Sequence, residues 1–96
     1  MKPTRSFHSL LQEPNRVGIE FLLVEVRMGL TFLDVADSTE SKEHRRRSLE
    51  NACTIYRPVA ELLSHVIPSP AEDSELRNKL SMIKERLLHG GLSVEA

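Results

Sequence analysis

The sequence predicts an all-α protein, a small antiparallel three-helix bundle with up-down-up order. Length and composition fit one small domain, because the chain has 96 residues and is 40% hydrophobic. Aromatic residues make up only 4% of it, and the alternation of Val, Thr and Ile that is typical of strands is nearly absent. Three stretches of helical periodicity, joined by short connections, complete the argument.

The chain divides into an arm, a bundle and a tail. In this prediction residues 1–14 form a short N-terminal arm, residues 15–91 the helical bundle and residues 92–96 a C-terminal tail. The arm is either irregular or a short helix. Its apolar residues are Phe7, Leu10 and Leu11.

The first long helix is expected to run from about residue 15 to Ala36. Pro14 should end any helix before it, and Asn15 is a good N-cap for the helix that follows. On a helical wheel, a polar strip about 80° wide follows one side, and almost all of the remaining arc of about 280° is apolar. The strip consists of Arg16, Glu20, Arg27, Thr31 and Asp34. We therefore expect water along one narrow edge of this helix.

A row with three small residues lies opposite the polar strip. Its members are Gly18, Leu22, Glu25, Gly29, Phe32 and Ala36. Each glycine inside a helix costs about 1 kcal/mol relative to alanine, so we expect a neighbouring helix to approach closely here. Glu25 is the exception in this row, because a buried carboxylate needs a cation or a proton. We interpret it as a candidate buried acid, either structural, through an ion pair or by reaching the rim, or functional.

The second helix is expected to begin near residues 37–40, whose sequence Asp-Ser-Thr-Glu has the spacing of a capping box. Pro58 lies inside the helical pattern, on the outward side, so we favour a continuous helix that bends there. A break into two helices near Arg57 is the alternative. The apolar face comprises Leu49, Ala52, Cys53, Tyr56, Val59, Ala60, Leu63 and Ile67.

The third helix has the sharpest boundaries. Ser69 is the expected N-cap, Pro70 occupies the first helical position and Glu72 completes a capping box. Gly90 and Gly91 should end the helix. A narrow apolar seam is formed by Leu76, Leu80, Ile83 and Leu87.

Charge and cysteine content narrow the class of function. The chain has 13 basic and 14 acidic residues, evenly spread, so bulk electrostatics does not favour binding to nucleic acid or anionic membranes. The single cysteine, Cys53, excludes an intramolecular disulfide and fits a reducing compartment. The N-terminus lacks the apolar core of a signal peptide, and the most apolar stretch, residues 17–36, contains four charged residues. We expect a cytoplasmic protein without a membrane span.

The residues predict no catalytic, metal or cofactor site. Of the four histidines, only His44 has a carboxylate at helical spacing, on Glu40, and two residues do not make a metal site. Cys53 falls on an apolar face and should behave as a small hydrophobe. No glycine-rich phosphate loop is present, since Gly90 and Gly91 follow a helix and do not precede one.

One basic cluster lies at the start of the second helix. Consecutive helical residues point about 100° apart, so its arginines cannot form a single flat patch. Acidic residues at positions 40, 43 and 50 are within reach for pairing on the helix surface. We favour a solvated, internally paired helix end, with a phosphate or nucleic-acid contact as the alternative. The cluster consists of Lys42, Arg45, Arg46 and Arg47.

Some residues resemble a tetratricopeptide helical hairpin. Met28 and Gly29 followed by Phe32, and Ala52 followed by Tyr56, match the positions at which small residues let the two helices of that hairpin cross closely. The resemblance covers about thirty positions and one copy of the repeat. It implies a protein-interaction module without catalysis.

The apolar arc of the first helix leads to the functional prediction. A helix with two neighbours needs an apolar face near half its circumference, and this helix has more. Either the arm folds back over the surplus, or a protein partner covers it, including a second copy in a two-fold dimer. The candidate contact residues are Phe7, Leu10, Leu11, Ile19, Leu23, Val26, Leu30 and Leu33.

Two other classes of function remain open at this point. One is a phosphate-binding or nucleic-acid-binding accessory protein that uses the basic cluster of the second helix. The other is an enzyme or ligand carrier built around Glu25, which requires a cavity beside that carboxylate.

Overall fold

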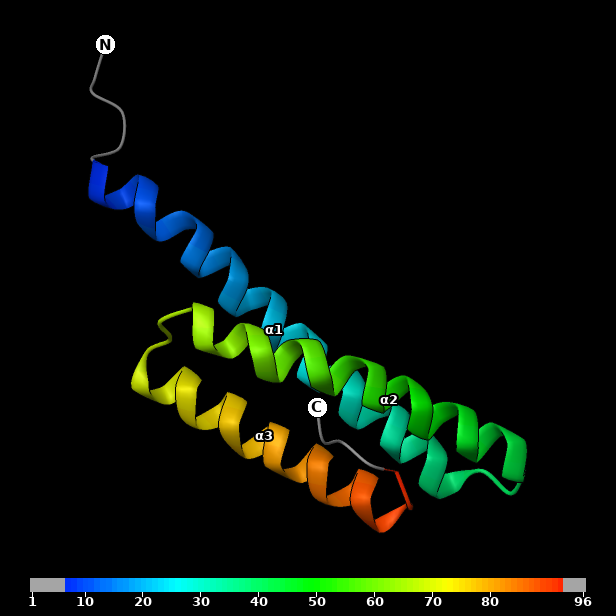
Figure 1. Cartoon of the computed structure of the whole chain (residues 1–96). Coiled ribbons are helices and arrows are strands. Elements are labelled where there is room, and N and C mark those ends of the chain that lie inside the picture. Colours follow the sequence, from blue (N-terminus) through cyan, green and yellow to red (C-terminus); the bar gives the residue numbers. More distant parts are fainter. Residues whose placement is uncertain (1–6, 93–96) are drawn as a thin grey trace.

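The computed structural model confirms the all-α three-helix bundle with up-down-up order (Figure 1). It describes residues 7–92. Within that range the α-helices are α1 (Phe7–Ser38), α2 (Lys42–Leu62) and α3 (Pro70–His89), and a short 3₁₀ turn, η1 (Leu63–His65), follows α2. Short connections join the helices, so α1 and α3 run parallel to each other and antiparallel to α2.

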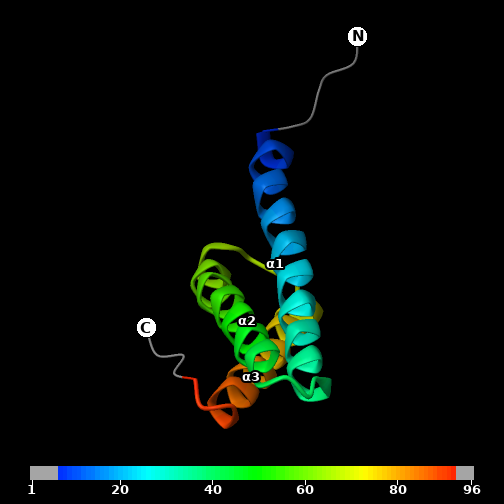
Figure 2. The ribbon, with the colours of Figure 1, turned by 90° about the vertical axis from the view of Figure 1, so that its right-hand side faces the viewer.

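Helix α1 begins earlier than predicted. It is continuous from Phe7 and carries Pro14 in its interior, so the expectation that Pro14 ends a preceding helix was wrong. An internal proline removes one hydrogen bond and crowds the preceding turn, but it does not forbid a helix. This part of α1 extends past the neighbouring ends of α2 and α3, as Figures 1 and 2 both show. Water can therefore solvate the carbonyl group that the proline leaves unpaired.

Asn15 has a different task from the N-cap that the sequence predicted. It lies inside α1, and its side chain forms two hydrogen bonds with the backbone of Ile67 in the loop before α3. Asn15 Nδ2 donates to the carbonyl oxygen of Ile67 over 3.1 Å, and the amide of Ile67 donates to Asn15 Oδ1 over 2.6 Å. Asn15 thus ties the connection between the second and third helices to the first.

The start of α2 also differs from the prediction. Helix α1 continues to Ser38, and the amide of Thr39 still donates to the carbonyl oxygen of Val35 over 3.0 Å. Residues 37 and 38 are therefore the end of α1 and not a cap of α2. The N-cap is Ser41, whose Oγ accepts a hydrogen bond from the amide of His44 over 3.2 Å.

The prediction that α2 continues through Pro58 is confirmed, and the alternative break near Arg57 was wrong. Pro58 is exposed, as expected for a residue on the outward side. The apolar face ends sooner than predicted, because α2 stops at Leu62 and η1 turns the chain. Ile67 is 83% exposed and Ala60 is exposed as well, so neither belongs to the core.

The boundaries of α3 are confirmed. Ser69 Oγ accepts from the amide of Glu72, and the Glu72 carboxylate accepts from the amide of Ser69, which is a complete capping box. His89 is the last helical residue, Gly90 is the C-cap and Gly91 adopts a positive φ of 92°.

The core runs along the centre of the bundle. The predicted seam of α3 is fully used, since all four of its residues are buried. From α1 the core receives Ile19, Leu22, Val26, Leu33 and Ala36; from α2 and η1 it receives Ala52, Val59 and Leu63. Gly29 is buried where side chains of both other helices meet α1: a Cβ at this position would lie 3.1 Å from Ile83 Cδ1 and 3.5 Å from Ile55 Cγ2. The expected close approach at Gly29 is thus made by side chains.

No helix within residues 7–92 is apolar over a length that could cross a bilayer.

The Asn15 contact gives a prediction about stability. Asn15→Ala removes two hydrogen bonds, each contributing about 0.5–1.5 kcal/mol, and gains about 0.5 kcal/mol of helix propensity. We expect a net loss of about 1 kcal/mol in the free energy of unfolding, measured by urea denaturation. Asn78→Ala is the matched control, because Asn78 is an exposed helical asparagine on α3. It gains the propensity alone and should be neutral or slightly stabilising; equal effects of the two substitutions would contradict the role of Asn15.

Candidate interaction surface on helix α1

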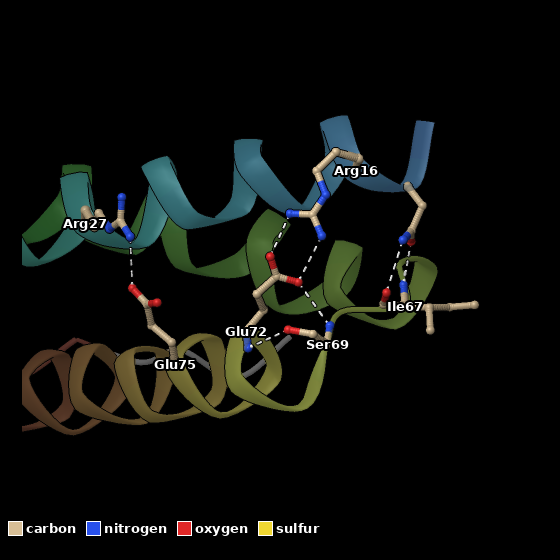
Figure 3. A network of polar contacts seen from close by, with 7 residues as sticks. Arg16, Arg27, Ile67, Ser69, Glu72 and Glu75 are labelled. Carbon is tan, nitrogen blue, oxygen red and sulfur yellow. Dashed lines mark hydrogen bonds and ion pairs between the residues drawn. The ribbon is translucent and has the colours of Figure 1, made fainter. Parts of the chain in front are cut away.

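The polar strip of α1 is where this helix meets α3. Its residues are exposed, as predicted, but three of them form ion pairs across the helix boundary (Figure 3). Arg16 Nη1 lies 2.6 Å from Glu72 Oε2, and Arg27 Nη2 lies 3.1 Å from Glu75 Oε2. The strip is thus more than an edge wetted by solvent: it carries the polar contacts between the two parallel helices.

The pair Arg16–Glu72 is the most connected of these contacts. Arg16 donates through both terminal nitrogens, and Glu72 also accepts the capping-box hydrogen bond from Ser69 (Figure 3). The hydrogen bond from Arg16, and next the one from the Ser69 backbone, lower the pKa of Glu72 to about 2. The same contact raises the pKa of Arg16. A bidentate pair that also closes a capping box fixes the start of α3 against α1.

Glu75 and Arg86 continue this row of charges along the bundle. The hydrogen bond from Arg27, with a smaller contribution from Lys79, lowers the pKa of Glu75. At the other end of the bundle, Arg86 Nη2 lies 2.6 Å from Asp37 Oδ2 and 3.1 Å from Asp34 Oδ1. Partial burial acts to lower the pKa of Arg86, but its hydrogen bonds to the two aspartates outweigh that effect and raise it.

A second line of residues on α1 remains uncovered. Val17, Phe21, Val24, Met28 and Val35 are all large, apolar and exposed, with exposed fractions between 44% and 65%. They follow one another at spacings of four, three, four and seven residues, and the exposed Thr31 fills the gap before Val35. This is the spacing of the contact seam in a two-stranded coiled coil. We call these five residues the α1 stripe; it lies opposite the face that packs into the core.

The structure moves the candidate contact surface to residues other than those chosen from the sequence. Ile19, Val26 and Leu33 are buried in the core, and Leu23 and Leu30 are partly buried against it. Five of the eight candidates therefore serve the bundle itself. The other three, Phe7, Leu10 and Leu11, lie in the first turns of α1, and their side chains are outside the described ones.

The sequence did contain a signal for the α1 stripe. The three-and-four spacing through Val17, Phe21, Val24 and Met28 is visible without a structure. What the wheel could not decide is which apolar face of so apolar a helix turns toward the core, because both faces have helical spacing. The ion pairs to α3 supply that information, and they depend on residues more than 45 positions away in the chain.

Glu25 lies between the core face and the α1 stripe. It is half-buried, so its carboxylate is not enclosed as the sequence suggested. No cavity beside it is defined by the structure in the described residues. Its role as a functional acid stays a prediction.

The basic cluster of α2 is engaged with its own chain. Arg45 Nε donates to the carbonyl oxygen of Ala36 over 3.2 Å, and its Nη2 donates to that of Thr39 over 2.9 Å, so Arg45 caps the end of α1. Arg46 pairs with Glu50 and Arg47 with Glu43, each one helical turn away. Such exposed pairs contribute only about 0.3–0.5 kcal/mol and can open. Lys42 is exposed.

Other chemistry receives little support from the described residues. No three His, Cys, Asp or Glu side chains among them converge as a metal ion requires. Cys53 is half-buried, reduced, and engaged in a contact of its own. A depression of about 340 Å³ lies between α2 and α3, with Tyr56, Arg77 and Lys84 in its lining, but it is shallow and open, unlike the concave sites that bury a small ligand.

Comparisons of the chain with models of protein families, with curated proteins and with solved structures found no match.

The Arg16–Glu72 contact gives a prediction about pH. The pKa of Glu72 is about 2 in the folded chain and about 4.5 when the carboxyl is unperturbed, so folding favours the ionised form. Its contribution to stability is therefore complete above about pH 4.5 and is lost as the pH falls toward 2. Glu72→Gln keeps a capping-box residue but removes the charge. We expect its free energy of unfolding to fall less steeply than that of the wild type in this window.

The measurement is urea denaturation followed by circular dichroism at a series of pH values. Glu85→Gln is the control, because Glu85 is an exposed glutamate on the same helix. It should follow the wild type. Parallel curves for the wild type and Glu72→Gln would contradict the assigned role of the ion pair.

Proposed function

We propose that this chain is a small helical protein-interaction module without catalytic activity, and that the α1 stripe is its binding surface. The observation that carries the proposal is the row of five large apolar side chains exposed on one line of one helix. Isolated exposed apolar residues are ordinary on protein surfaces, but a contiguous line of them on a soluble monomer usually marks a site of interaction.

The geometry of α1 strengthens the proposal. The sequence left two ways to cover the apolar surplus of this helix, namely a folded-back arm or a partner. Residues 7–14 continue α1 in a straight line with the rest of the helix, so they cannot lie over its face (Figures 1 and 2). The remaining way to cover the stripe with protein is contact with another chain.

The resemblance to a tetratricopeptide hairpin points to the same class of function. Gly29 and Ala52, its two small residues, are both buried where α1 and α2 face each other. Action in the cytoplasm remains part of the proposal, on the ground of the single reduced cysteine. The nucleic-acid alternative gains no observation, since the arginines of its basic cluster are paired within the chain or cap α1.

Site-specific photo-crosslinking in cells that express the protein tests the proposal. A benzophenone amino acid replaces Phe21 in the stripe, which keeps an aromatic side chain there; in the control it replaces Met82 of α3, which is similarly exposed. We expect discrete crosslinked products from position 21 and only background from position 82. Background from both positions, or the same products from both, would contradict an interaction through the α1 stripe.

A further inference from the structure

The inference concerns what covers the α1 stripe, and it rests on the proposed function, in which the stripe is a binding surface. We propose that the occupant is a second copy of this chain, bound as an antiparallel pair of α1 helices. A two-fold axis passes between the helices near residues 22 and 23. The self-complementary pattern of α1 about that point carries the proposal.

Apolar side chains match across the axis. In an antiparallel pair centred there, Phe21 of one copy faces Val24 of the other, and Met28 faces Val17. Each layer therefore combines a large side chain with a smaller one, which fills the space between two helices without a void or an overlap. The three-and-four spacing keeps these layers on one seam along both helices.

Charges match across the same axis. Glu20 and Arg27 flank the stripe on the side that faces α3, and both are exposed. In the antiparallel pair Glu20 of each copy lies beside Arg27 of the other, which gives two attractive pairs. Arg27 already donates to Glu75, but its side chain is 59% exposed and a guanidinium has five N–H groups, so it can hold a second carboxylate.

The parallel arrangement lacks this complementarity. In a parallel coiled coil, the residue before one seam position faces the residue five places later in the partner, which brings Glu20 beside Glu25. Two such like-charge contacts would oppose the pair. In the antiparallel pair Glu25 instead faces Gly18, which has no side chain to oppose it. An unrelated partner would give no reason for acid, base and apolar sizes to be arranged symmetrically about one point.

The projecting part of α1 gains a partner in this arrangement. The register that pairs residue 21 with residue 24 also pairs residues 7–14 of one copy with residues 31–38 of the other. In the sequence, the seam spacing continues backward from Val17 through Pro14, Leu10 and Phe7. Helix α1 is 32 residues long, about 48 Å, whereas α2 and α3 have 21 and 20 residues. The second copy thus covers the length that the bundle leaves free.

The two bundles do not obstruct the pair. The α1 stripe lies opposite the core face of α1, so α2 and α3 of each copy lie on the far sides of the paired helices. The contact is isologous and closes after two copies, so it does not generate filaments.

Sedimentation of the purified full chain, with reciprocal charge variants, tests the proposal. The wild type should show twice the mass of the 10.9 kDa chain at micromolar concentration. Glu20→Arg and Arg27→Glu each replace two attractive contacts by two repulsive ones, so each should raise the dimer dissociation constant by about tenfold or more.

An equal mixture of the two charge variants should restore the dimer. In the mixed pair, the arginine introduced at position 20 of one chain faces the glutamate introduced at position 27 of the other. The native Arg27 and Glu20 face each other at the second contact, so both contacts are attractive again. Restoration cannot come from repaired folding, since the mixture contains the same two chains.

Two apolar variants test the surface itself. Val24→Glu should abolish the dimer at the concentrations where the wild type is dimeric, while Met82→Glu, at a similarly exposed site on α3, should leave it intact. A monomeric wild type at hundreds of micromolar, a dimer that survives Val24→Glu, or a mixture of charge variants that stays monomeric would each overturn the antiparallel pair. A monomeric wild type combined with photo-crosslinks from position 21 to a different protein would overturn self-association and leave the proposed function standing; background at position 21 would remove both.

Discussion

The continuity of α1 is the constraint on which the rest of the structure depends. One helix of 32 residues is packed against two helices of 21 and 20, which cover one side of it and leave its first turns projecting. Its apolar arc is wider than two neighbours can bury, so packing the core necessarily leaves large apolar side chains outside. The exposed stripe is a consequence of this mismatch and not of a locally unusual sequence. It also explains why the functional question concerns a helix face, while no enclosed pocket is defined in the described residues.

Polar contacts decide which face of α1 is left outside. Because both faces are apolar, burial alone distinguishes poorly between rotations of the helix about its axis. The rotation observed places Arg16, Arg27 and Asp34 beside Glu72, Glu75 and Arg86 of α3 and turns Gly29 toward Ile83. Each exposed ion pair contributes at most about 1 kcal/mol. Three of them in a row, together with a glycine that no other residue could replace without repacking, suffice to select one rotation among alternatives of similar apolar burial. Weak interactions therefore specify the surface that the stronger hydrophobic effect leaves exposed.

The sequence was most informative where the determinants are local. The capping box at Ser69 and Glu72, the glycines at 90 and 91 and the seam of α3 were all correctly predicted, because each depends on residues within a few positions of one another. Asn15 and Arg45 were misjudged for the opposite reason: their partners, Ile67 and the end of α1, are brought to them by the tertiary fold. The candidate contact residues Ile19, Val26 and Leu33 failed in the same way, since the rotation of α1 is set by α3.

Hydrogen–deuterium exchange of the wild-type chain as a function of protein concentration tests the central claim most directly, because it locates the contact without any substitution. Residues 7–14 project beyond the ends of α2 and α3, so their amides should exchange rapidly in the monomer and slow markedly as the concentration rises into the dimeric range. The exposed end of α3 near His89 should change least. Exchange of residues 7–14 that does not depend on concentration would contradict the pairing of α1 with a second copy.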